Sequence, residues 1–311
     1  MSTVLRFPPR SFRRQSQAQS HHAALPASAR ETALRCELEY DVWAPSHFIL
    51  HIKAAETPDQ AILSESLESS PHLTIRESSD CEFGNRVFRF DAQPGRIQLR
   101  YDARVALLRP ENTGREAERD ITALPDDVLQ FLLPSRFCPS DLLGSEALRL
   151  FGGMPRGIGR VEAICTWIRK NIDYRIGSSG PTTTALQVYN QRAGVCRDFA
   201  HLAITFCRSL NIPARLVVGY CHFDEPPQDF HALFEVWLED RWIMFDPTAL
   251  AEPRNVVRIG TGYDAKNIAF STIFGAMQMT YMQIQVDHDG RPPVDNPEPG
   301  QATVQRVDTV H

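Results

Sequence analysis

Three side chains in the second half of the chain are of the types needed for nucleophilic catalysis: Cys196, His231 and Asp246. A histidine can take the proton of a thiol, and a carboxylate can hold the imidazole in one tautomer and stabilise its charged form. Each type alone is common in structural roles, as a buried thiol or a turn residue. Catalysis therefore requires that the flanking elements bring the three together.

Cys196 lies at or just inside the start of a predicted amphipathic helix that ends near Asn211 and Pro213. At a helix N-terminus the unpaired N–H groups and the dipole favour an anion, so a thiol there can lose its proton near neutral pH. We expect Gly194 to allow a sharp backbone turn that exposes the sulfur and frees an N–H group for an oxyanion. The apolar stripe of this helix consists of Phe199, Leu202, Ala203, Phe206 and Leu210.

His231 and Asp246 belong to two successive strand patterns that predict a β-hairpin. With a two-residue turn, Leu238 pairs with Arg241, and Leu233 lies opposite Asp246. His231 shares a strand face with Leu233, so Asp246 becomes its diagonal neighbour. A slightly longer turn would place His231 and Asp246 directly opposite each other. Either register brings the carboxylate within reach of the imidazole.

Further residues are candidates for supporting roles. Trp167 and Tyr174, upstream of the nucleophile, could assist the oxyanion or line the cleft, although Trp167 lies on an apolar helical stripe that favours core packing. Asp198, in the first helical turn, could simply complement the helix dipole. Alternatively, Arg197 and Asp198 form a pair that locks the helix start and so aims Cys196.

The spacing of the cysteines is not typical of a disulfide-bonded protein or of a structural metal site. Their number is odd, their spacing is irregular and no CxxC pair occurs, so disulfides and a structural zinc site have little support, and reduced thiols in the cytoplasm are expected. Cys165 and Cys207 fall in or beside apolar helical stripes and are expected to be inert, and Cys221 beside His222 has no further metal ligands. Thiol chemistry requires no metal or organic cofactor. The seven cysteines are Cys36, Cys81, Cys138, Cys165, Cys196, Cys207 and Cys221.

The domain organisation follows from where the periodicity changes. Alternating patterns around 36–42 and 97–105 predict a small antiparallel β module, a sandwich, over residues 34–106. Short helical pieces between prolines predict a connecting helical layer over 107–157. The catalytic domain is expected over 158–286, between a disordered arm at 1–33 and a mobile tail at 287–311.

Composition restricts the classes of partner. A net charge of −5 gives no reason to expect nucleic acid or an anionic membrane as partner. The sequence contains no run of eighteen apolar residues, and its start has no apolar core typical of a secretory signal. A homo-oligomer is possible but not indicated.

The residues around the three candidates resemble the bacterial transglutaminase-like superfamily. The resemblance covers about 160–275 and rests on the segments 194–202, 212–215, 219–220, 230–232, 245–248 and 260–265. It implies an α+β fold, a papain/transglutaminase-like cysteine-protease core in which a helix presents Cys196 against an antiparallel sheet that carries His231 and Asp246. Residues 34–106 resemble the β-rich N-terminal region that often accompanies this domain in bacterial proteins. Two positions depart from many relatives: Leu233 replaces a tryptophan, and Tyr263 replaces an arginine.

The expected reaction is acyl transfer at an amide bond of a peptide or protein. The Cys196 thiolate attacks the carbonyl, and His231 protonates the departing amine. Water as the acceptor would make the protein a cysteine peptidase or amidase, which we favour because no second substrate site is evident. An amine acceptor would make it a crosslinking transferase, and a non-catalytic scaffold on the same fold is a third alternative.

Overall fold

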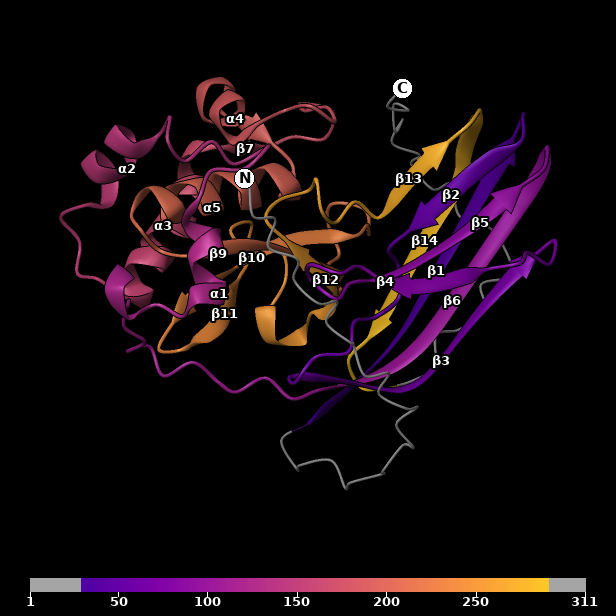
Figure 1. The fold of residues 1–311 in the computed structure, drawn as a ribbon, viewed down its shortest axis with the longest axis horizontal. Coiled ribbons are helices and arrows are strands. Elements are labelled where there is room, and N and C mark those ends of the chain that lie inside the picture. The colour runs from indigo at the N-terminus through magenta and orange to yellow at the C-terminus, as the bar shows by residue number, and fades with distance from the viewer. Residues whose placement is uncertain (1–28, 291–311) are drawn as a thin grey trace, which may run out of the picture.

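The computed structural model describes residues 29–290 and divides into a sandwich of strands and a unit of helices around a smaller sheet (Figure 1). The expected arm over 1–33 and the expected tail over 287–311 lie outside the described residues, apart from 29–33 and 287–290. Of these, residues 30–33 and 287 belong to strands. No helix within the described residues is long and apolar enough to cross a membrane.

The predicted β-sandwich is present and is built from two antiparallel sheets of four strands each in the described residues. One sheet has the order β14 (Met277–Asp287), β1 (Arg30–Val42), β6 (Gly95–Leu107) and β3 (Gln60–Ser70). The other has the order β13 (Ser271–Phe274), β2 (Ser46–Leu50), β5 (Arg86–Ala92) and β4 (Arg76–Ser79). Alternate residues of the strands fill the space between the sheets, where Phe48 stacks on Phe90 with ring centroids 4.8 Å apart.

The boundaries of this sandwich differ from the predicted domain limits. Strands β13 and β14 pair with β2 and β1, so residues 271–287 complete the sandwich instead of the catalytic domain. β14 runs along nearly the whole of β1, from Ala33 opposite Asp287 to Val42 opposite Met277. The local sequence of β14 does not identify the sheet that this strand joins, because strand pairing is a non-local property.

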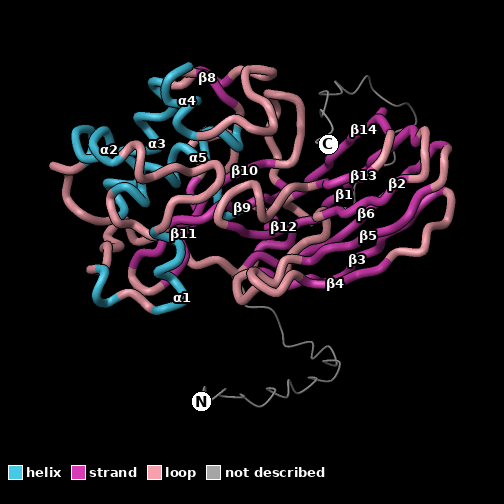
Figure 2. Tube along the Cα trace, turned by 45° about the horizontal axis from the view of Figure 1, so that its top comes forward, coloured by secondary structure: helices cyan, strands magenta, loops and turns pink. Residues whose placement is uncertain are grey.

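The second unit contains the sheet β11 (Arg241–Phe245), β10 (His231–Leu238), β9 (Ala214–Tyr220) and β12 (Val257–Gly262), in that order. Figure 2 shows the helices gathered around this sheet and away from the sandwich. They are α1 (Asp126–Leu129), α2 (Gly144–Phe151), α3 (Ile158–Asn171), α4 (Ala185–Gln191) and α5 (Cys196–Ser209), with short 3₁₀ turns at Ile121–Ala123, Gln130–Leu132 and Pro253–Asn255. A small parallel pair, β7 (Asp173–Tyr174) and β8 (Ala193–Gly194), lies beside α5.

Helix α5 is the centre of the second unit. Its predicted apolar stripe is buried, and Phe206 packs edge-on against Trp167 of α3 and Phe151 of α2, with centroids 5.5 and 5.4 Å apart. The layer predicted as a connection over 107–157 is therefore only partly a connection. Its helix α2 is part of the helical core, because Phe151 and Ala147 are buried there.

The hairpin formed by β10 and β11 has the predicted two-residue turn. Leu238 pairs with Arg241, and Glu239 and Asp240 both have positive φ angles, 46° and 63°, as a type I′ turn requires. Pairing continues to Phe234 opposite Phe245, so the register places Asp246 one residue beyond the last pair.

Candidate active site

Cys196 is the first residue of α5, as predicted. Its side chain is half-buried, whereas Cys36, Cys138, Cys165, Cys207 and Cys221 are buried and Cys81 is exposed. Burial raises the pKa of Cys36, Cys138 and Cys165 to about 12, so those thiols stay protonated at neutral pH. Cys196 is thus the accessible thiol at a helix start, where unpaired N–H groups favour a negative charge.

The start of α5 is held by Asp198, whose side chain is fully buried. One carboxylate oxygen accepts the backbone N–H of Val195 at 2.9 Å and the hydroxyl of Ser179. The other oxygen accepts Arg197 Nη2 at 3.0 Å, and that guanidinium also donates to the carbonyl of Gly180 at 2.8 Å. Asp198 therefore does more than complement the dipole: with Arg197 it ties the residue before Cys196 to the loop around 179–180.

Gly194 is required by this arrangement for a reason that differs from the expected sharp turn. Its φ angle is not in the left-handed region. A Cβ atom at position 194 would instead lie 2.7 Å from Asp198 Cβ and 3.2 Å from Asp198 Oδ2. The missing side chain is what lets Asp198 fold back onto the strand before the helix.

His231 and Asp246 are in contact in the structure. His231 Nε2 lies 3.0 Å from Asp246 Oδ2, and both side chains are almost fully buried. Asp246 also accepts hydrogen bonds from the N–H and hydroxyl of Thr248 at 2.8 and 2.6 Å and from the N–H of Ala251 at 2.8 Å. The carboxylate is therefore fixed by donors on both oxygens, and it leaves His231 Nδ1 available for the thiol of Cys196.

The electrostatics of this group favour a charged imidazole. Burial by itself would lower the pKa of His231, but hydrogen bonds with Asp246 and with Cys196 raise it to about 10. Burial likewise opposes ionisation of Asp246, and the hydrogen bond and charge of His231 hold the pKa of that carboxyl below its ordinary value. The contacts thus favour the imidazolium form of His231 beside the Asp246 carboxylate.

Tyr174 lies next to the nucleophile. The parallel pairing of β7 with β8 sets Tyr174 beside Gly194. Burial and the charge of the neighbouring Cys196 raise the pKa of Tyr174. The Tyr174 side chain is therefore a neighbour of the Cys196 thiol.

Trp167 does not join these residues. Its ring packs against Phe206 and Tyr189, with centroids 5.5 and 5.9 Å away, so its place is in the helical core that the apolar stripe favours. Cys221 is buried while its neighbour His222 is exposed, so the two side chains do not form a common site.

Two residues near the candidate site escaped sequence reasoning. Asp229, two positions before His231, has a carboxyl whose pKa is raised to about 6 by burial, opposed by the N–H of Phe230 and the charge of His231. Ser179, in the loop before α4, donates to Asp198. Neither position carries a periodic or motif signal, because each contributes through contacts between distant loops.

Comparison with protein families gives two matches that together cover most of the described chain. Residues 147–247 match the model of the transglutaminase-like superfamily, and residues 32–123 match that of the bacterial transglutaminase N-terminal domain. A crystal structure from Cytophaga hutchinsonii, described as a candidate cysteine protease, is 36% identical in sequence. It superposes with a TM-score of 0.79 over 87% of this chain and 95% of that chain.

The alignments with curated relatives cover shorter segments of the chain. An uncharacterized protein of Mycobacterium leprae is 34% identical over 120 residues, which are 35% of this chain and 42% of that protein. An uncharacterized protein of Mycobacterium tuberculosis is 34% identical over 116 residues, 32% of this chain and 37% of that protein. The chain thus aligns with less than half the length of these mycobacterial relatives.

Proposed function

Because the chain belongs to the transglutaminase-like superfamily, we propose that it is a thiol-dependent acyl-transfer enzyme in which Cys196, His231 and Asp246 act as nucleophile, acid–base and orienting group. The observation that carries the proposal is the set of contacts at His231. This imidazole is buried and hydrogen-bonded to Asp246 at 3.0 Å, and both Asp246 and the half-buried Cys196 at the start of α5 raise its pKa.

The reaction begins with the Cys196 thiolate and the His231 imidazolium. The sulfur attacks the carbonyl carbon of an amide, and the carbonyl oxygen becomes an oxyanion between the Cys196 N–H and the Tyr174 hydroxyl. His231 gives its proton to the nitrogen of the leaving amine, the C–N bond breaks and a thioester forms. The neutral imidazole then takes a proton from the acceptor, which attacks the thioester and releases Cys196.

Water is the acceptor that we favour, which makes the protein a cysteine peptidase or amidase. Water needs no binding site of its own, whereas an amine acceptor does. The cavity of about 570 Å³ beside the sheet of β11, β10, β9 and β12, here called the core sheet, does not supply such a site, because Cys196, His231 and Asp246 do not line it. Transfer to a primary amine is the alternative, and it uses the same thioester. The reduced state that this chemistry needs agrees with a cytoplasmic location, which is part of the proposal.

Alkylation with iodoacetamide tests the nucleophile without knowledge of the substrate. Cys81 is the natural internal control, since it is the exposed cysteine of the chain and lies in the sandwich. We expect Cys196 to be alkylated faster than Cys81 below pH 8, as measured by mass spectrometry of the two peptides, and we expect His231→Ala to remove the difference. Equal rates for the two thiols at every pH would contradict an activated nucleophile.

Turnover tests the reaction itself. Peptide libraries incubated with and without a labelled primary amine separate hydrolysis from amine transfer, and a predominance of amine incorporation would overturn the preference for water. Cys196→Ala should abolish both reactions, whereas Cys81→Ala should leave them unchanged. If the Cys196→Ala protein were as active as the wild type, the acyl-transfer scheme would be wrong.

A further inference from the structure

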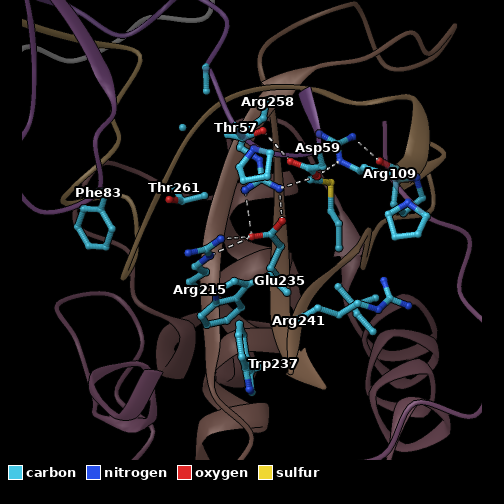
Figure 3. A pocket seen from close by; sticks show the side chains of 18 of the residues that line it. Thr57, Asp59, Phe83, Arg109, Arg215, Glu235, Trp237, Arg241, Arg258 and Thr261 are labelled. Atoms are coloured by element: carbon cyan, nitrogen blue, oxygen red, sulfur yellow. Dashed lines mark hydrogen bonds and ion pairs between the residues drawn. The ribbon is translucent and has the colours of Figure 1, made fainter. Parts of the chain in front are cut away.

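A cavity of about 570 Å³ lies between the sandwich and the core sheet (Figure 3). The sandwich contributes the loop at 55–59 and the turn at 83–85, and the linker contributes Arg109 and its neighbours. Strands β9 to β12 of the core sheet supply the remaining wall. The volume is in the range of sites for small molecules.

Charged side chains of the lining contact one another, as the dashed lines in Figure 3 show. Glu235 accepts Arg215 Nε at 2.9 Å and is also paired with Arg258. Asp59 accepts Arg109 Nε at 2.8 Å and lies 3.6 Å from Arg258. The exposed fractions of the side chains of Arg258, Arg109 and Glu235 are only 7%, 9% and 1%.

This cluster holds three guanidinium groups and two carboxylates, so a positive charge is left over. Arg215 and Glu235 form one pair, Arg109 and Asp59 form another, and Arg258 shares both carboxylates. Burial and the charge of Arg258 lower the pKa of Arg109, the expected result of crowding guanidinium groups. An uncompensated buried charge is costly, and a bound anion is one way to neutralise it.

Unused hydrogen-bond donors occur on two side chains of the cavity lining. Arg258 Nε and Trp237 Nε1 are buried atoms with no hydrogen-bond partner among the described residues, and both side chains belong to the cavity lining. Both are donors, so the group that would satisfy them is an acceptor. Trp242 adds an aromatic wall, because its ring stacks under the Arg215 guanidinium at 4.0 Å and meets Trp237 edge-on at 5.3 Å.

The other charges of the lining do not cancel this excess, because they are exposed or paired at the rim. Glu56 is exposed to solvent. Arg254 is 45% exposed and pairs with Glu111. Arg241 pairs with the buried Glu116, and Asp240 pairs with Arg119, which is outside the lining.

We propose that this cavity is a binding site for a small oxyanion, a carboxylate or a phosphate ester with an apolar or aromatic body. The oxyanion lies against Arg258 and accepts its unused Nε–H, and the apolar body contacts the tryptophan rings. The site is separate from the candidate catalytic residues. Although His231 and Glu235 share a face of β10, the buried apolar cluster around Leu233, Val217 and Met244 occupies that face.

Quenching of tryptophan fluorescence measures binding directly, because two of the four tryptophans, Trp237 and Trp242, line the cavity. The probes are benzoate, phenyl phosphate and succinate, added to the full-length protein at low ionic strength. Benzamide is the matched neutral probe for benzoate. We expect saturable binding of benzoate or phenyl phosphate, and the stronger of the two identifies the oxyanion, while succinate tests the need for an aromatic body. If no probe binds, or if benzamide binds as tightly as benzoate, the proposal is wrong.

Arg258→Gln is the informative substitution. It removes the surplus charge and still leaves Glu235 paired with Arg215 and Asp59 paired with Arg109, so the fold should persist, which circular dichroism and a melting curve check. Binding should weaken about 10- to 100-fold, the range expected for loss of a charge-assisted hydrogen bond. Arg254→Gln, in the same lining but at its exposed rim, is the control, with a change of about twofold or less.

Unchanged affinity in a folded Arg258→Gln protein would overturn the proposed site. If that variant does not fold, the wild-type titration with benzoate and benzamide still decides whether the cavity selects an anion. The titration measures binding and not turnover, and it is repeated with Cys196→Ala, which cannot cleave the amide of benzamide by the proposed reaction. A failure of the catalytic proposal is therefore distinguishable from a failure of this one.

Discussion

The close approach of Gly194 and Asp198 makes Gly194→Ala the most informative substitution in the candidate active site. The added Cβ would lie 2.7 Å from Asp198 Cβ, a separation that real side chains do not tolerate. Asp198 cannot move away easily, because it is fully buried and accepts hydrogen bonds from Val195, Ser179 and Arg197. The carboxylate must therefore give up part of these contacts.

The size of the effect follows from the groups involved. Overpacking of a buried site costs about 1–3 kcal/mol, and loss of a hydrogen bond to an N–H at a helix start costs about 0.5–2 kcal/mol. We expect the free energy of unfolding to fall by about 1.5–5 kcal/mol in total. Since the same contacts aim Cys196, a displacement near 1 Å should slow the reaction of the thiol by up to about 100-fold.

Two measurements check this prediction. Denaturant unfolding gives the loss of stability, and the rate of iodoacetamide alkylation relative to Cys81 gives the effect on the thiol. Gly144→Ala is the matched control, because Gly144 also lies at a helix start and a Cβ there meets no atom within 4 Å. If Gly194→Ala is as stable as the wild type, the packing argument fails. If it is less stable but alkylated normally, Asp198 stabilises the helix without aiming Cys196.

Three further predictions concern the groups around Cys196. Asp246→Asn removes a charge-assisted hydrogen bond to His231, worth about 1.5–3 kcal/mol, so turnover of an amide substrate should fall by roughly 10- to 150-fold without being abolished; turnover equal to wild type would exclude the orienting role. Tyr174→Phe should lower kcat by about 100-fold through loss of an oxyanion donor while leaving the alkylation rate of Cys196 nearly unchanged, and an unchanged kcat would exclude that role. Burial lowers the pKa of His201 to about 4, so the folded protein favours the neutral imidazole. The contribution of this group to the free energy of unfolding is therefore fully present above the unfolded pKa near 6.5, and it is lost as the pH falls from there toward 4. The loss is on the order of 3 kcal/mol, and denaturant unfolding of His201→Gln should depend less on pH over that range.

The parts of the site that could be predicted from the sequence are those set by local geometry. A helix start at Cys196 follows from the stripe and from the residues that end the helix. The hairpin register follows from a short turn, because a two-residue turn leaves no freedom in which residues pair. The contact between His231 and Asp246 thus follows from the register that the pairing of Leu238 with Arg241 sets.

The parts that could not be predicted depend on contacts between distant segments. Tyr174 reaches Cys196 only because two-residue strands at 173–174 and 193–194 pair in parallel, and strands this short have no periodic signal. A glycine is needed at position 194 because the backbone there approaches Asp198 closely, and not because the chain turns. A sequence pattern does not distinguish these two causes. Arg258 and Arg109 look like ordinary polar residues in the sequence, and their shared cavity is formed by three separate regions of the chain.

The pairing of β14 with β1 has a consequence for the order in which the protein folds. The two strands are separated by more than two hundred residues, yet they are neighbours in one sheet. During synthesis β1 can pair with β6 early, but its other edge stays open until the whole second unit, the helices and the smaller sheet, has emerged from the ribosome. Such long-range pairing slows folding and leaves an unpaired edge that can associate with other chains. The second unit is, in topological terms, an insertion into the sandwich, and the pairing of β14 with β1 is the last step in forming the sandwich that the chain order permits.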